Sequence, residues 1–209
     1  MRQACLLALA LSVCSSGFAY EGPRIQSMQQ LKFAGIQRQT LDYSCGAAAL
    51  TILLNQYFGD SVREQDLLAD IVFRLPPEEM VNRIQEGFSM LDLKTAAENA
   101  GYDATGILLP KESVGLLPGP VIILLRRETL NHFVVLKGVR QGRAFLADPA
   151  RGHLRIPLHE LFKEWRGETL VLGRDDVGLL KAHALAIPNS GNLYPESQSV
   201  RELQHLPFK

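Results

Sequence analysis

The sequence predicts an α+β fold in which N-terminal helices pack on a C-terminal antiparallel sheet. Apolar residues recur at helical spacing through most of the first half of the chain. Short runs of branched and aromatic residues, separated by turn residues, take over in the second half. Because the helices come first and the strands second, the chain is expected to build separate helical and sheet regions rather than alternating units.

The helices follow from periodicity and from their end signals. An extended lead-in is expected over residues 20–38. The first helix begins at Cys45, and Gly59 closes it. Ser89 is a plausible N-cap for a later helix that stops at Gly101. The predicted helices cover residues 45–58, 63–74, 78–86 and 89–101, with a helical turn or two at 157–165.

The strands follow from short apolar runs such as Val-Ile-Ile-Leu-Leu and Phe-Val-Val-Leu. A short turn around Gln141-Gly142 joins two of these runs and makes them antiparallel neighbours. The predicted strands cover residues 102–109, 120–126, 132–139, 143–147, 153–156 and 169–172.

Composition places the chain among globular proteins. It has 209 residues, a hydrophobic fraction of 46% and a formal net charge of zero. Charge neutrality and the lack of a basic run give no support to nucleic-acid binding. We expect a signal peptide at 1–19, one domain at 20–175 and a C-terminal extension at 176–209, whose Pro-, Ser- and Asn-rich end is typical of partly disordered segments.

The N-terminus has the pattern of an export signal. Arg2 precedes an apolar run, and small residues precede a cut after Ala19. The run is too short to span a bilayer, so no stable membrane insertion is expected. Cleavage is favoured over a lipid anchor at Cys14, because the bulky Val13 stands where a small residue is wanted. The expected location is the periplasm.

Cys45 is then the single cysteine of the mature chain. In an oxidising compartment cysteines usually pair, so a lone thiol is either a buried core residue or a reactive group. Cys45 begins a helix, where unsatisfied N–H groups favour a negative charge and hence a thiolate. Gly46 after it would leave room for a substrate backbone.

Gln39 lies six positions before Cys45. An isolated loop glutamine is usually just solvated. Beside the sulfur, however, its amide and the Cys45 backbone N–H would form two donors for a developing oxyanion.

His132 opens one predicted strand and Asp148 ends the next. An antiparallel hairpin would bring them to the same end, where His132 could act as base and Asp148 could orient it. Considered alone, His132 could equally be an ordinary surface residue, and Asp148 could be a turn-forming residue before proline.

Together these residues resemble the motifs of the peptidase C39 family, the papain-like bacteriocin-leader-processing cysteine peptidases. The likeness spans roughly residues 35 to 172 and lies in three stretches: Gln39 with Cys45-Gly46-Ala47-Ala48-Ala49-Leu50, the helix region from Gly87 to Tyr102, and His132-Phe133-Val134-Val135-Leu136 with Ala147-Asp148-Pro149-Ala150-Arg151-Gly152. It implies a papain-like fold.

The resemblance also implies roles for four residues: Cys45 as nucleophile, His132 as general base and acid, Asp148 as orienter and Gln39 as oxyanion donor. It implies cleavage after small residues such as a glycine pair. Ser44 departs from the family, whose members often carry an acidic residue there. The chain resembles in particular the exported C39-like branch of the pseudomonad functional amyloid (Fap) systems, which implies a polypeptide substrate among amyloid or secretion components.

Two other readings stay open. One is a peptidase-like binding module or adaptor that recognises a secreted polypeptide without cutting it. The other is a different acyl transfer, such as a transglutaminase-like or amidase reaction, on the same triad. No metal or other cofactor is expected, because the histidines show no ligand spacing. No nucleotide is expected, because no phosphate-binding loop is present.

Overall fold

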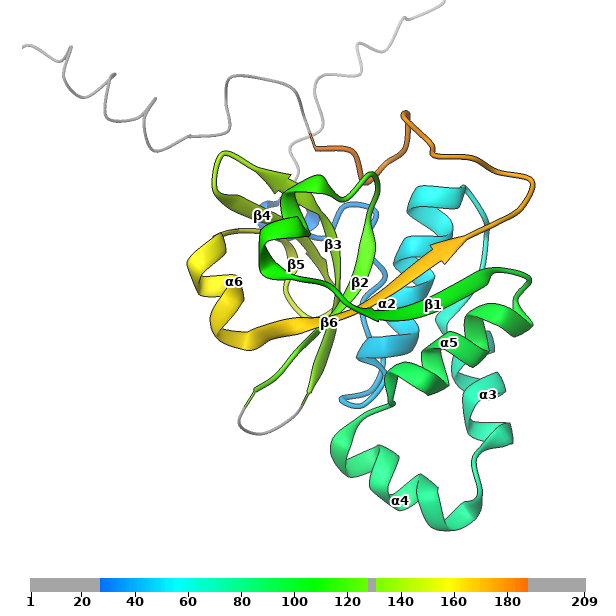
Figure 1. The fold of residues 1–209 in the computed structure, drawn as a ribbon. Helices are drawn as coiled ribbons and strands as arrows, with labels where there is room; N and C mark the ends of the chain where they lie inside the picture. Colours follow the sequence, from blue (N-terminus) through cyan, green and yellow to red (C-terminus); the bar gives the residue numbers. More distant parts are fainter. Residues whose placement is uncertain (1–26, 128–130, 188–209) are drawn as a thin grey trace, which may run out of the picture.

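The computed structural model describes residues 27–127 and 131–187 (Figure 1). The expected signal segment with Cys14, and the end of the C-terminal extension, lie outside these residues. Predictions about export and lipidation therefore concern a part of the chain that the structure does not describe.

A single six-stranded sheet forms the centre of the described chain, in the order β1-β6-β2-β3-β4-β5. Every neighbouring pair is antiparallel, as expected. β6 is longer than predicted because it lies between β1 and β2 and pairs with both. The strands are β1 (Asp103–Leu108), β2 (Val121–Leu125), β3 (His132–Arg140), β4 (Arg143–Asp148), β5 (Gly152–Pro157) and β6 (Trp165–Gly173).

Helices cover both faces of this sheet (Figure 1). α2, α3 and α5 contribute to the core on one face, and α6 packs on the other. α4 buries none of its residues. The helices are α1 (Met28–Lys32), α2 (Cys45–Leu53), the π-helical η1 (Leu54–Phe58), α3 (Glu64–Arg74), α4 (Pro77–Glu86), α5 (Met90–Asn99), the 3-10 segment η2 (Lys111–Leu116) and α6 (Leu158–Glu164).

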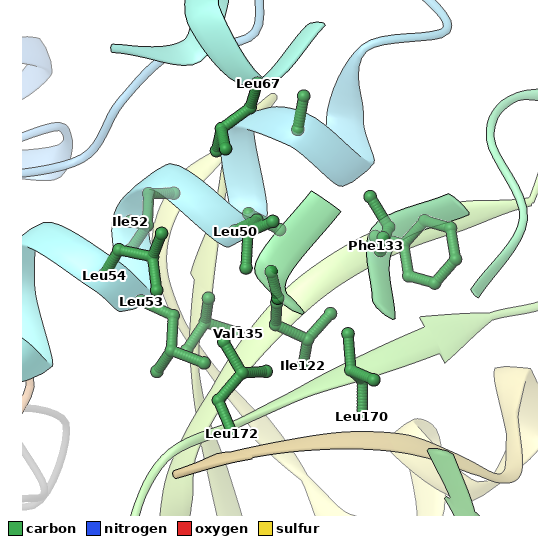
Figure 2. Close-up of a cluster of buried hydrophobic side chains, with 14 of the residues drawn as sticks. Leu50, Ile52, Leu53, Leu54, Leu67, Ile122, Phe133, Val135, Leu170 and Leu172 are labelled. Atoms are coloured by element: carbon green, nitrogen blue, oxygen red, sulfur yellow. The ribbon is translucent and has the colours of Figure 1, made fainter. Parts of the chain in front are cut away.

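Alternation along the strands explains the two cores. On β2, Ile122 packs in the α2 core, whereas Val121 and Ile123 pack in the α6 core. All five residues of β2 are buried, which accounts for its continuous apolar run. Figure 2 shows the α2 core, in which Leu50 and Leu53 lie opposite side chains of the sheet.

The segment before α2 differs from the prediction. Residues 28–32 form the short helix α1 and are not extended. Ser27 accepts a hydrogen bond from the Gln30 backbone N–H, and the Gln30 side chain accepts one from the Ser27 N–H. This capping box is a sequence signal that periodicity over such a short segment did not reveal.

The described part of the C-terminal extension returns to the domain. The Leu180 backbone N–H donates to the Tyr57 hydroxyl, and the Ala184 N–H donates to the Gln56 carbonyl. Leu185 is 1% exposed and belongs to the α2 core. Residues 176–187 therefore add to the packing around η1.

Gly46 serves helix packing. A Cβ at this position would lie 2.8 Å from Leu93 Cδ2 and 3.0 Å from Leu93 Cδ1. Leu93 is completely buried on α5. The glycine is therefore explained by the close approach of α2 and α5, and not by the room for a substrate that its position suggests.

We expect Gly46→Ala to lower the free energy of unfolding by about 1–3 kcal/mol, because the added methyl overpacks the α2–α5 contact. Urea unfolding of the single variants and of Gly46→Ala/Leu93→Ala measures the effect. The double variant should lose less than the sum of the single losses, because truncating Leu93 makes room for the methyl. Strict additivity would contradict the packing explanation.

Candidate active site

His132 and Asp148 meet at one end of the β3–β4 hairpin. Val135 pairs with Ala147, so Asp148 lies diagonally across from His132. His132 Nε2 lies 2.9 Å from Asp148 Oδ1. The two side chains are nearly inaccessible, with 8% and 0% of their surfaces exposed. The predicted hairpin geometry is therefore present.

Asp148 accepts hydrogen bonds from more than the imidazole. Its Oδ1 also accepts from the backbone N–H groups of Ala150 at 2.8 Å and Arg151 at 3.1 Å. The Arg151 Nε–H donates to Oδ2 at 2.7 Å. Burial raises the pKa of the Asp148 carboxyl. The hydrogen bond and charge of His132, together with the hydrogen bonds from Arg151 and the Ala150 N–H, outweigh burial and leave the pKa far below its usual range. The group is a carboxylate at neutral pH.

The charge on Asp148 fixes the tautomer of His132. A carboxylate can only accept, so Nε2 carries the proton in this bond, and Nδ1 is left as the second functional nitrogen. Burial lowers the pKa of His132, but hydrogen bonds and charges from Asp148 and Cys45 together raise it above its ordinary value. The structure thus brings Cys45, His132 and Asp148 together.

Cys45 is the first residue of α2 and is only 1% exposed. It is a free cysteine. No side chain caps the N-terminus of α2, because the hydroxyl of Ser44 is directed to Leu41 and Glu64 instead. The first N–H groups of the helix therefore remain as partial positive charges beside the sulfur. Such a position favours negative charge on the sulfur or on a bound oxyanion.

Gln39 lies in the loop before α2, held by its backbone N–H, which donates to the Pro149 carbonyl at 3.3 Å. Its side-chain Nε2 donates to the Leu41 carbonyl at 3.2 Å. An amide has two N–H groups, so the second is left for a ligand. Its Oε1 is buried and has no hydrogen-bond partner in the described part of the chain. Gln39 therefore borders the Asp148 turn, but no bond joins its side chain to Cys45.

Two further charged residues take part in this arrangement without having been singled out from the sequence. Arg151 belongs to the Asp148 turn, and its proximity in sequence was an available signal. Glu64 contacts the Gln39 loop from α3, 20 residues beyond Ser44, and is 2% exposed. An acidic residue in the first turn of a helix is common, so only the structure identifies Glu64 as buried.

Residues 27–127 and 131–187 contain no helix of the length and apolar character needed to cross a bilayer. Over the same residues, no group of three His, Cys, Asp or Glu side chains is arranged to hold a metal ion.

The directions of the two pKa shifts give a stability prediction. The Asp148 pKa is lowered by folding, so the charge stabilises the fold above about pH 3.9, and this contribution is lost as the pH falls below that value. The His132 pKa is raised, so its contribution is present below about pH 6.5 and is lost as the pH rises through the folded value.

We expect Asp148→Asn to lower the free energy of unfolding by about 3–5 kcal/mol at pH 6, because it removes one partner of a buried pair. Urea unfolding at pH 6, 4 and 3 measures the deficit, which should shrink below about pH 3.9, because Asp148 of the unfolded native sequence takes up a proton there while the folded carboxylate keeps its charge. Asp66→Asn is the matched control, since Asp66 is exposed and its ion-pair partner among the described residues is Arg63. A deficit independent of pH would contradict a role for the charge.

Comparison with known proteins identifies relatives of this arrangement. The model of the peptidase C39 family matches residues 34–176. A protein of Pseudomonas aeruginosa named "Probable functional amyloid protease FapD" is 36% identical over 151 residues, which are 72% of this chain and 65% of the relative. The protein of the same name in Pseudomonas fluorescens is 30% identical over 79% of this chain and 71% of its own length. The chain thus spans about two thirds of the length of these relatives.

Among solved structures, the peptidase domain of Streptococcus ComA, a bifunctional ABC transporter of a quorum-sensing pathway, has the same fold. Its TM-score is 0.56 at 19% identity, over 66% of this chain and 97% of that domain. The predicted papain-like architecture, helices on an antiparallel sheet, is therefore confirmed. The family match covers all four residues singled out from the sequence, and the chain belongs to the peptidase C39 family of cysteine peptidases.

Proposed function

We propose that this chain is a periplasmic cysteine endopeptidase that cleaves an exported polypeptide after small residues such as a glycine pair. The observation that carries the proposal is the buried His132–Asp148 bond beside the helix that begins at Cys45. This arrangement supplies a nucleophile, a base and an orienting carboxylate.

In the first half of the reaction, Cys45 Sγ attacks the carbonyl carbon of the scissile peptide bond. His132 Nδ1 holds the thiol proton and then gives it to the leaving nitrogen. The carbon–nitrogen bond breaks, a thioester with Cys45 forms, and the new amine departs. Asp148 keeps the imidazole in the required tautomer and stabilises its positive charge.

In the second half, a water molecule attacks the thioester carbon. His132 Nδ1 accepts one proton from the water and returns it to the sulfur as the carbon–sulfur bond breaks. The acid product leaves, and Cys45 is restored. Both tetrahedral intermediates carry a negative oxygen, for which the Cys45 backbone N–H and the remaining Gln39 N–H are the proposed donors.

The proposed substrate follows from the relatives. The two Pseudomonas proteins are named as functional amyloid proteases, which supports a substrate among amyloid or secretion-system components. A compartment outside the cytoplasm agrees with the export signal expected at residues 1–19. We propose no nucleic-acid or nucleotide partner.

The first prediction concerns the thiol without any substrate. In the mature chain, expected to begin at residue 20 and to hold Cys45 as its single cysteine, iodoacetamide should label Cys45 at pH 6 at least tenfold faster than in the same chain with His132→Ala, because the imidazole takes the thiol proton. Intact mass against time measures the rate. His159→Ala is the matched control, since the His159 side chain is 72% exposed and, in the chain as described, pairs with its neighbour Glu160. Equal rates in all three proteins would remove the proposed pair.

The second prediction concerns cleavage of a quenched fluorescent peptide with a central glycine pair. The native chain should cut it, Cys45→Ala should not, and a peptide with leucines at those two positions should stay intact. Gln39→Ala should lower kcat by roughly 100- to 1000-fold with little change in KM, because it removes one oxyanion donor. Gln65→Ala, on the exposed side of α3, serves as control. Binding of the glycine peptide without cleavage would favour an adaptor instead.

A further inference from the structure

A buried carboxylate on α3 holds the loop that carries Gln39 and ends at Cys45. Glu64 is 2% exposed, and its Oε1 accepts from the Ser44 hydroxyl at 2.6 Å. The same oxygen accepts from the Thr40 backbone N–H at 3.1 Å and from its hydroxyl at 3.3 Å. Oε2 accepts from Gln37 Nε2 at 3.3 Å. One side chain thus contacts the loop before Gln39, after it, and next to Cys45.

The partners of Glu64 distinguish it from a structural ion pair. In the part of the chain that the structure describes, its partners are neutral hydroxyl, amide and backbone groups. The 2.6 Å bond from Ser44 has the length of a hydroxyl donating to a carboxylate. A buried charge without a neighbouring cation costs several kcal/mol unless hydrogen bonds satisfy it. The hydrogen bonds from the loop therefore offset the desolvation of the Glu64 carboxylate.

Glu64 is itself placed by the fold. Asn55 Nδ2 donates to the Val62 carbonyl at 2.8 Å, and the Val62 N–H donates to Asn55 Oδ1 at 2.8 Å. This pair of bonds fixes the chain at the start of α3, whose first residue is Glu64. The N-terminus of α3 also favours a negative charge at this position.

Three hydrogen bonds, linked through the backbone of Leu41, lead from Glu64 to the Gln39 amide. Ser44, held by Glu64, accepts at its hydroxyl oxygen from the Leu41 N–H at 3.1 Å. This bond orients the loop at Leu41, whose carbonyl accepts from Gln39 Nε2 at 3.2 Å. The bond to Leu41 determines where the second N–H of Gln39 points. Glu64 therefore sets the direction of the proposed oxyanion donor without touching the reacting atoms.

We infer that Glu64 is a positioning residue for the oxyanion loop, by which we mean residues 37–44, including Gln39. The inference rests on the proposed peptidase function and deepens it. It separates two tasks: His132 and Asp148 control proton transfer, and Glu64 controls the direction of the Gln39 oxyanion donor. A donor displaced by about 1 Å can cost roughly 100-fold in rate, so loss of this anchor should affect acyl transfer selectively.

The test compares two reactions of Cys45 in Glu64→Gln, which keeps the size of the side chain and removes its charge. Iodoacetamide alkylation needs the thiolate but forms no oxyanion. Acylation by the p-nitrophenyl ester of acetyl-glycylglycine passes through an oxyanion, and the burst of nitrophenolate measures it. We expect acylation to fall about 10- to 100-fold while alkylation stays within about twofold.

Three further proteins sharpen the test. Glu98→Gln is the matched control, because Glu98 pairs with Lys94 on the surface of α5. Ser44→Ala breaks the chain of bonds while leaving the carboxylate, and should reproduce a selective loss of about tenfold if Glu64→Gln folds poorly. Gln39→Ala/Glu64→Gln should be acylated no more than twofold slower than Gln39→Ala, because Glu64 acts through Gln39.

Three results would each overturn the inference. They are equal losses of alkylation and acylation in Glu64→Gln, full additivity in the double variant, and acylation at the native rate in both Glu64→Gln and Ser44→Ala. Failure of the proposed function is distinguishable from these results. A native chain that is alkylated rapidly but not acylated would remove the peptidase proposal itself, and the role of Glu64 would fall with it.

Discussion

The buried carboxylate of Asp148 is the group on which the geometry of the site depends. It fixes the tautomer of His132, and it closes the turn after β4 through the N–H groups of Ala150 and Arg151. The carbonyl of Pro149 in the same turn accepts from the Gln39 N–H. One turn therefore holds the His132 imidazole directly and touches the loop that carries Gln39. The β3–β4 pairing that places Asp148 is thus a requirement of the proposed chemistry as well as of the fold.

A second buried carboxylate, Glu64, accepts hydrogen bonds from the loop before α2, just as Asp148 accepts them from the turn after β4. Each is surrounded by donors from a loop that has no regular structure of its own. Because unpaired buried charge is costly, each carboxylate favours the loop conformation that supplies its donors. The two loops then meet at the bond between Gln39 and Pro149. Hydrogen bonds to the two carboxylates thus add to the apolar contacts of Ile36 and Tyr43 in holding these loops.

The sequence predicts most of the fold because each core has a simple period. β2 and β3 are short apolar runs, and α5 has a serine cap that forms as expected. His132 and Asp148 were predictable as a pair because one tight turn joins their strands. Glu64 was not, because its partners lie about 20 residues away across a helix. Gly46 was misread, because only the packed structure reveals its contact with Leu93.

Asp148 and Glu64 differ in the groups that surround them, and they therefore act on the site in different ways. Asp148 faces the ionisable groups His132 and Arg151, so its charge acts directly on the proton affinity of the imidazole. Glu64 faces neutral donors, and no hydrogen bond joins it to His132 or Cys45 in the described chain. Its effect must therefore pass through the positions of loop atoms. In the described part of the chain, the groups proposed for proton transfer and for oxyanion binding lie in two networks that meet at the bond between the Gln39 N–H and the Pro149 carbonyl.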